Sequence, residues 1–219
     1  MNPLLEASPK PRFDLVSPEH VVPAIENLIA RHDAVVADLI RNAPTEFASA
    51  WLPLERIDAE LDAAWGVVSH LHSVADTPQL RAAHREAQTL LVEHGTRVGQ
   101  NRDLHAMHAS LAAAPFFAEL PLADQAAVRR SLRGFELSGV ALDERDRERF
   151  GKNAVEMSEI ANAFSSAVLD ATEAWSELVT DPTLLKGVSD QAKTMFAAAA
   201  AEKGLEGWLI TLSNRPSWQ

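Results

Sequence analysis

Cysteine and tyrosine are both absent from this chain of 219 residues. Without cysteine there is no disulfide framework, no thiolate metal site and no cysteine nucleophile. The chain also lacks a run of about 18 uncharged apolar residues, the length that a membrane-spanning helix needs. No apolar signal-peptide segment follows Lys10 and Arg12. These absences predict a soluble, cytoplasmic protein with no membrane partner.

Positive charge is scarce. Lysine and arginine total 20 against 31 acidic residues, which gives a formal net charge of -11. A surface this acidic repels phosphate backbones, so we expect no nucleic-acid partner. The charged run at 143–149 alternates in sign and is typical of a solvated helix start. Apolar residues make up 47% of the chain, enough for a folded core without a metal or a disulfide.

The motifs of the common hydrolases are also missing. The sequence has no glycine-rich phosphate loop and no G-x-S-x-G nucleophile elbow. None of its eight histidines lies in a His-Glu-x-x-His motif, which places two zinc ligands and a catalytic glutamate on one helix. We therefore assign no catalytic, cofactor-binding or metal-binding residue from the sequence.

Histidines outside that motif could still form a zinc site, because imidazole is a common zinc ligand. His105 and His108 are three residues apart and could share a helix face, but no glutamate follows the first of them. His70 and His72 lie about 200° apart on an ideal helix and cannot chelate one ion there. Two other helical segments offer one imidazole each, at His84 and His94. We expect all eight histidines to lie on the surface or pack between helices, and a small metalloprotein using His105 and His108 is the weaker alternative.

Two pairs of carboxylates are spaced to share a helix face, Glu156 with Glu159 and Asp58 with Asp62. Such a pair can act as acid and base if its surroundings separate the two pKa values. In a chain with 31 acidic residues, however, these spacings arise by chance. We expect both pairs to belong to solvated helix faces.

Tryptophan is frequent for a chain without tyrosine, and the five positions are Trp51, Trp65, Trp175, Trp208 and Trp218. An aromatic wall for peptide side chains is one interpretation. We favour packing instead, with Trp65 in an apolar helical stripe and Trp175 and Trp208 beneath a short ribbon. Trp218 is close to the end of the sequence and is expected to be exposed.

The apolar spacing predicts a mainly α protein, because apolar residues recur at steps of three and four. Capping residues and prolines divide the pattern into helices over about 18–42, 45–74, 77–99, 103–113, 122–133, 143–174 and 189–203. In the longest helix, 143–174, the stripe comprises Phe150, Ala154, Met157, Ala161, Phe164 and Val168. The pattern at 175–180 and 207–212 predicts two strands that could pair as a small antiparallel ribbon.

No flexible linker or fixed-period repeat divides the chain. We expect an extended leader at 1–17 with three prolines, a single helical domain at 18–212, and a divergent or truncated tail at 213–219.

Several phrases resemble, in the same order, the amino-terminal half of the oligopeptidase A and thimet oligopeptidase family of zinc metallopeptidases. They are NPLL at 2–5, PEHVVPAI at 18–25, VSHL at 68–71, VGQ at 98–100, FELSGVAL at 135–142, VLDAT at 168–172, LVTD at 178–181 and LEGWLITL at 205–212. Each phrase is weak alone, and their common order over nearly the whole chain carries the resemblance.

The resemblance implies the multi-helix amino-terminal lobe of a clamshell oligopeptidase. Members of the family cleave short peptides with one zinc ion in a deep channel between two lobes. The amino-terminal helices form much of one lobe and restrict entry to short, unfolded substrates. The zinc ligands and the catalytic glutamate lie in the later half of the family, so no such residue is carried over to this sequence.

The departure from the family is at the carboxyl end. After Thr211 and Leu212 the family continues through a proline-containing strand into many further helices, whereas here residues 213–219 follow, with Pro216-Ser217 as a displaced echo of the family's Pro-Ser. We therefore expect a truncated N-terminal domain that lacks the catalytic zinc domain, is inactive alone and has that missing lobe as its partner. The alternative is a free-standing helical module that binds peptides or proteins and self-associates through an exposed apolar face.

Overall fold

The computed structural model describes residues 2–6 and 10–212. Its internal contacts group the chain into two compact units, 1–159 and 160–219. Each unit is described separately below. The single domain expected over 18–212 includes parts of both units, and that expectation stays a prediction.

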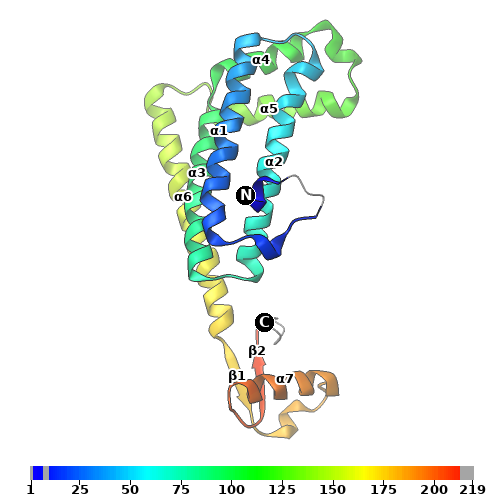
Figure 1. Cartoon of the computed structure of the whole chain (residues 1–219), viewed down its shortest axis with the longest axis vertical. Helices are drawn as coiled ribbons and strands as arrows, with labels where there is room; N and C mark the ends of the chain where they lie inside the picture. The colour runs from blue at the N-terminus through cyan, green and yellow to red at the C-terminus, as the bar shows by residue number, and fades with distance from the viewer. Residues whose placement is uncertain (1, 7–9, 213–219) are drawn as a thin grey trace. The chain divides into compact units, whose positions relative to one another are not determined.

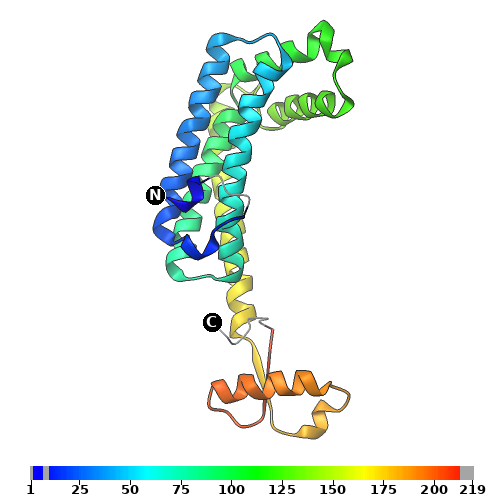
Figure 2. The ribbon, with the colours of Figure 1, turned by 45° about the vertical axis from the view of Figure 1, so that its right-hand side comes forward.

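Three long helices run side by side in the first unit: α1 (Pro18–Asn42), α2 (Phe47–Val74) and α3 (Pro78–Gly99) (Figures 1 and 2). α1 begins with proline at its first position, where a missing N–H costs nothing. The Thr77 hydroxyl accepts the Leu80 N–H at 3.1 Å and caps α3 in the same cap-plus-proline arrangement. α1 packs against both α2 and α3, so it forms the centre of this bundle.

The main core lies along the α1 face that the apolar spacing selected. Val21, Ile25 and Leu28 are fully or almost fully buried there. They pack with Ile57, Leu61, Ala64 and Val68 of α2 and with Leu80 and Ala87 of α3. Burial of a large aliphatic side chain contributes about 1.5–3 kcal/mol, so this seam is the main source of stability in the first unit.

Two shorter helices, α4 (Arg102–Ala113) and α5 (Leu122–Leu137), pack together at one end of the bundle (Figures 1 and 2). A 3-10 turn at Pro115–Glu119 joins them. α5 runs past the predicted end near Arg133, because Gly134 keeps a helical conformation in open space. The helix ends instead at Leu137, and Gly139 follows the cap residue with a φ of 82°, while the Val140 N–H donates to the Phe135 carbonyl at 3.1 Å.

The longest helix, α6 (Glu144–Ala174), has no buried residue. The predicted stripe therefore exists as spacing but not as a core face. In the first unit Phe150 and Ala154 are half-buried and Met157 is exposed. Nothing among the described residues covers the exposed side chains, which is why a pattern that normally indicates burial fails to do so here.

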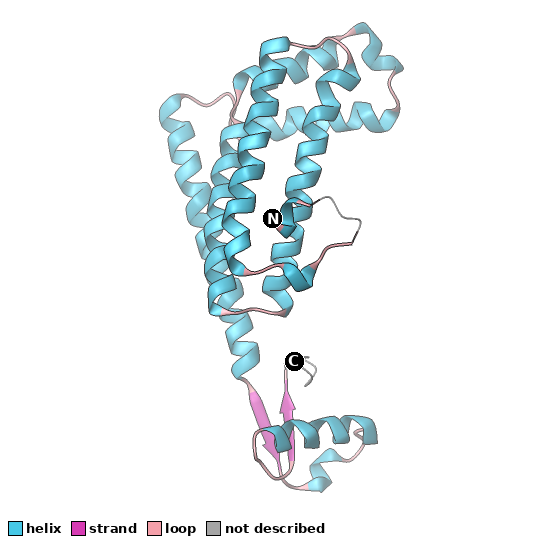
Figure 3. Ribbon diagram, viewed as in Figure 1, coloured by secondary structure: helices cyan, strands magenta, loops and turns pink. Residues whose placement is uncertain are grey.

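The second unit contains a two-stranded antiparallel ribbon, β1 (Ser176–Val179) with β2 (Trp208–Thr211), and a helix, α7 (Asp190–Glu202) (Figure 3). Ser176 pairs with Thr211 and Val179 with Trp208. Ser189 caps α7, and Gly204 follows the helix with a φ of 68°. The predicted mainly α fold with a small ribbon is confirmed.

Some local predictions are wrong. Glu46, not Thr45, precedes the first turn of α2, since the Glu46 carbonyl accepts the Ala50 N–H. The leader is not simply extended: it forms 3-10 turns at Pro3–Leu5 and Phe13–Leu15, and the first buries Leu4. The Asn2 side chain stabilises that first turn, because its amide donates to the His20 carbonyl at 2.7 Å while its oxygen accepts the Leu4 N–H.

Residues 213–219 lie outside the described residues. Among the helices that are described, none is long and apolar enough to cross a bilayer.

Candidate functional site

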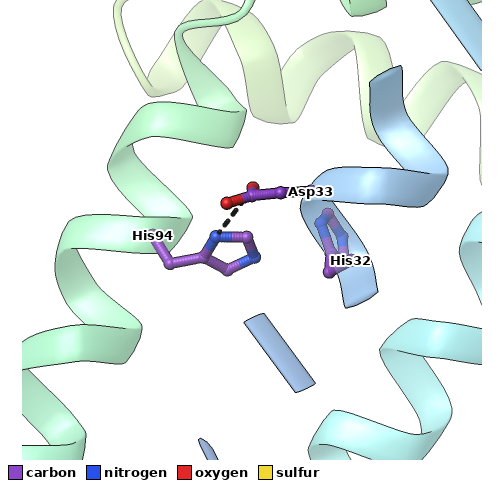
Figure 4. A group of neighbouring side chains, drawn as sticks. All are labelled: His32, Asp33 and His94. Carbon is purple, nitrogen blue, oxygen red and sulfur yellow. Dashed lines mark ion pairs between the residues drawn. The ribbon is translucent and has the colours of Figure 1, made fainter. Parts of the chain in front are cut away.

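A cluster of His32, Asp33 and His94 lies where α1 faces α3 (Figure 4). Each of the three side chains offers one ligand atom, and these atoms lie within 4.8 Å of one another. His94 Nδ1 is 3.5 Å from Asp33 Oδ1, and the two imidazole rings meet edge to face with centroids 4.6 Å apart. Among the described residues this is the only group of three such ligands so close together. We call it the α1–α3 histidine cluster.

The His32 ring is oriented by α2. His32 Nε2 lies 3.1 Å from Asp58 Oδ1, and only 3% of the residue is exposed. A carboxylate partner favours the proton on Nε2, which leaves the lone pair on Nδ1. That nitrogen is buried and has no hydrogen-bond partner. An unsatisfied buried acceptor normally costs about 1–3 kcal/mol. A hydrogen-bond donor or a cation bound to His32 Nδ1 would remove this cost.

Arg97, one helical turn beyond His94, already places a positive group at the cluster. Its guanidinium donates to Asp33 Oδ2 at 2.6 Å and lies 3.0 Å from His94 Nδ1. Because arginine can only donate, His94 Nδ1 must be the acceptor and the ring neutral. Burial, with the nearby His32 ring, lowers the pKa of His94 to about 4. His94 therefore presents a neutral imidazole beside the Asp33 carboxylate, which Arg97 already contacts.

A cavity of about 370 Å³ opens beside the cluster. His32, Asp58 and His94 form part of its wall, and the rest comes mainly from the far end of α3 and from α5, including Val98, Ser131, Gly134 and Phe135. A small ligand can therefore reach the imidazoles without unfolding of the bundle.

A second hollow, of about 590 Å³, lies between α3 and the first part of α6. Its wall is acidic, with Glu93, Glu148, Glu156 and Glu159, and it also carries Arg97 and Lys152. Glu156 and Glu159 are both exposed, which agrees with a solvated face. Asp58 and Asp62 are also exposed, but Asp58 is engaged by His32.

Among the described residues, no third ligand lies beside the predicted alternative metal pair, His105 and His108. His108 is buried, and its Nδ1 lies 2.8 Å from the Ser131 hydroxyl. His105 is half-buried and contacts the Phe135 ring edge to face. Burial lowers the pKa of His108 to about 4. Packing between α4 and α5 accounts for both residues.

A third histidine group stacks on tryptophan. The His84 ring lies 4.6 Å from the Trp65 ring and 4.2 Å from the His72 ring. Burial, with the neighbouring His72, lowers the pKa of His84 to about 4. Asp76, bound to Arg81 at 2.6 Å, lies 3.8 Å from His72 Nε2. The stack joins α2 to α3, so Trp65 is a packing residue as predicted.

The other tryptophans that the structure describes, Trp51, Trp175 and Trp208, do not form an aromatic wall. Trp51 lies between the Phe47 and His108 rings, at centroid distances of 5.9 and 5.1 Å. Trp208 is half-buried on the ribbon, but Trp175 is 41% exposed, so the prediction that both pack beneath the ribbon holds only for Trp208. The reason is that Trp175 precedes β1 and has no opposite partner on β2. Trp218 lies outside the described residues.

The second unit leaves most of its large apolar side chains uncovered. Four apolar residues are buried there: Val179, Leu185, Ala200 and Leu209. More than half of the side-chain surface is exposed at Ile160, Phe164, Leu184 and Met195. Exposed apolar surface of this density in so small a unit is typical of a binding face.

Sequence reasoning missed the α1–α3 histidine cluster. It tested pairs on one helix, whereas His32 and His94 are 62 positions apart and come from two different helices, α1 and α3. One feature of the sequence could have indicated the cluster: His32 lies on the apolar stripe of α1, between Leu28 on one side and Val35 and Val36 on the other. A histidine on a core face must find a partner, and His94 was one of the candidates.

Comparison with known proteins agrees with this fold. The sequence model described as the neurolysin/thimet oligopeptidase N-terminal domain matches residues 25–147, more than half of the chain. Oligopeptidase A of Salmonella typhimurium and that of Escherichia coli are each 38% identical over 212 residues, covering 96% of this chain and 31% of the relative. The probable cytosolic oligopeptidase A of Arabidopsis thaliana is 35% identical over 224 residues, with 99% and 32% covered.

The chain thus spans about a third of the length of the curated relatives that it matches. The match begins inside α1 and ends at the start of α6, so it takes in the helices of the first unit that carry the core. The chain belongs to the neurolysin/thimet oligopeptidase family and corresponds to its N-terminal domain.

Proposed function

We propose that this chain is the N-terminal helical domain of an oligopeptidase A-like zinc peptidase that cleaves short peptides, where it forms part of the wall of the peptide channel. The observation that carries the proposal is the match to oligopeptidase A, 38% identical over 212 residues and covering 96% of the chain. In this role the contribution of the domain is geometric. A rigid helical wall admits short, unfolded peptides and keeps folded proteins from the reacting groups.

The residues of the chain do not supply the chemistry of such an enzyme. A catalytic zinc polarises the scissile carbonyl and lowers the pKa of its bound water, and a glutamate accepts the proton. None of the eight histidines lies in the His-Glu-x-x-His arrangement that this chemistry uses in the family. We therefore propose that the chain alone is inactive and that its partner is the catalytic region of the peptidase, on the same or a separate chain.

The exposed apolar side chains of the second unit support a partner of this kind. Ile160, Phe164 and Val168 follow one another at helical spacing, and each is at least half exposed. A catalytic region that covers them would remove apolar area from water at roughly 25 cal/mol per Å². The same exposure favours the second candidate, a free-standing module that uses this face to bind peptides or itself.

A chimera tests the first proposal. The matched N-terminal segment of Escherichia coli oligopeptidase A is replaced by this chain, and cleavage of a quenched fluorescent short peptide is followed with zinc present. We expect the chimera to cleave the peptide, the same catalytic region without an N-terminal segment to cleave it poorly, and this chain alone to be silent.

A folded but inactive chimera would favour the interaction module. In that case equilibrium sedimentation of the chain should show self-association. Hydrolysis by the chain alone that survives repurification and disappears with a chelator would contradict both proposals.

A further inference from the structure

We infer that the α1–α3 histidine cluster binds one divalent transition-metal ion of the Zn²⁺ class, with His32, Asp33 and His94 as ligands. The donor set is two imidazoles and one carboxylate, which suits zinc better than magnesium or calcium, since the latter prefer oxygen ligands. This site is additional to the channel role proposed above and does not depend on it.

The distances are close to those that a metal requires. Zn–N and Zn–O bonds of about 2.0–2.2 Å place the ligand atoms of a tetrahedral site roughly 3.4 Å apart. Asp33 Oδ1 and His94 Nδ1 are already 3.5 Å apart. Each of the three side chains also offers one ligand atom within 4.8 Å of a ligand atom of the other two. Asp33 is partly exposed and can turn, so drawing the set together requires side-chain rotation rather than movement of a helix.

His32 provides an independent observation. Metal-bound histidines usually donate their other ring N–H to a carboxylate, which fixes the tautomer and the ring orientation. His32 has this partner in Asp58, at 3.1 Å from Nε2. Its Nδ1 is buried and without a hydrogen-bond partner, and the ring stands against His94. A metal ion would satisfy the nitrogen that the protein leaves unpaired.

Arg97 would compete with the ion. Its guanidinium contacts Asp33 and His94 Nδ1, two of the groups that a metal would use. More than half of the Arg97 side chain is exposed, so it can move into solvent when an ion arrives. The adjoining cavity of about 370 Å³, which His32 and His94 line, provides a path for the ion. Removal of Arg97 should therefore strengthen metal binding.

Titration calorimetry of the whole chain with zinc chloride tests the site, and the visible spectrum with Co²⁺ reports its geometry. We expect one Zn²⁺ per chain, at least tenfold weaker binding in Asp33→Asn and tighter binding in Arg97→Ala. Asp33 is partly exposed, so Asp33→Asn should stay folded, which circular dichroism checks. Because the ion binds only the folded state, zinc should raise the Tm of the wild type more than that of Asp33→Asn.

His105→Ala is the control, because it removes a histidine outside the cluster and should leave zinc binding unchanged. The inference is overturned if the wild type binds no zinc, if Asp33→Asn binds it as tightly as the wild type, or if only His105→Ala abolishes binding. Weaker binding in Arg97→Ala would likewise contradict it, because the arginine would then support the ion instead of competing with it.

Discussion

Three buried histidines, His84, His94 and His108, share one property: burial lowers the pKa of each to about 4. A neutral imidazole can pack against aromatic rings and accept or donate one hydrogen bond, which is how these residues join neighbouring helices. The unfolded chain, in contrast, binds a proton at each position near the ordinary pKa of 6.5. The free energy of unfolding therefore decreases as the solution becomes more acidic.

His108 allows this linkage to be measured. A histidine whose folded pKa is depressed contributes stability that is fully present above pH 6.5 and is lost as pH falls towards 4. The loss amounts to up to about 3 kcal/mol for one residue. His108→Phe keeps a ring beside Trp51 and Phe135 but cannot bind a proton. We expect this variant to lose less unfolding free energy than the wild type between pH 7.5 and 4, by about that amount. Urea unfolding from pH 7.5 to 4 measures it, and an unchanged slope would contradict the assigned cause.

Gly139 allows a test of backbone conformation. Its φ of 82° lies in the left-handed region, and an added Cβ would come within 2.5 Å of Leu142 Cδ1. We expect Gly139→Ala to lower the unfolding free energy by at least about 1 kcal/mol. Gly66→Ala is the matched control, because Gly66 lies within α2 in open space and should gain about 0.5–1 kcal/mol. Equal effects in urea unfolding would show that the turn is not constrained.

At this scale the sequence predicts some features and not others. The turn at Ser138-Gly139 is recognisable because glycine there has a local reason, a helix end in the left-handed region. The partnership of His32 with His94 has no local signal, since it depends on how α1 packs against α3. The same holds for Ser131 and His108, which come from different helices.

Helices follow from the sequence more completely than side-chain partners do. The spacing of apolar residues and the prolines at positions 18 and 78 predict α1 and α3 with nearly correct ends. Spacing alone, however, shows that one face of a helix is apolar and not what covers it. α6 has the spacing of a core helix and buries none of its residues. The missing information is the partner, which no local pattern contains.

Two isoleucines make this difference measurable. Ile25 in α1 is 0% exposed, whereas Ile160 in α6 is 62% exposed. We expect Ile25→Ala to cost about 2–5 kcal/mol through lost burial and a cavity. Ile160→Ala should change stability by no more than about 0.5 kcal/mol. Denaturant unfolding followed by circular dichroism compares them, and a large loss for Ile160→Ala would mean that the free chain already covers α6.

For the whole molecule, buried apolar area is divided unevenly. Both clusters of buried apolar residues lie in the first unit, where α1, α2 and α3 pack along their length. The described part of the second unit buries four apolar side chains, too few to offset the conformational entropy of some 60 residues by a wide margin. The first unit has the character of an independent fold, and the second unit is held together by few apolar contacts.

Hydrogen exchange can test the proposal that the catalytic region of the peptidase covers the second unit. In the free chain we expect the amides of α1 and α3 to exchange slowly and those of α7 and the β1–β2 ribbon to exchange through frequent local opening, because few apolar contacts hold the second unit closed. In the chimera with the catalytic region of oligopeptidase A, the amides of α7 and the ribbon should become protected, while those of α1 change little. Strong protection of α7 in the free chain would mean that the second unit is stable alone. Unchanged protection in an active chimera would mean that the catalytic region makes its contacts through the first unit, and the exposed face of α6 would then be available to a different partner.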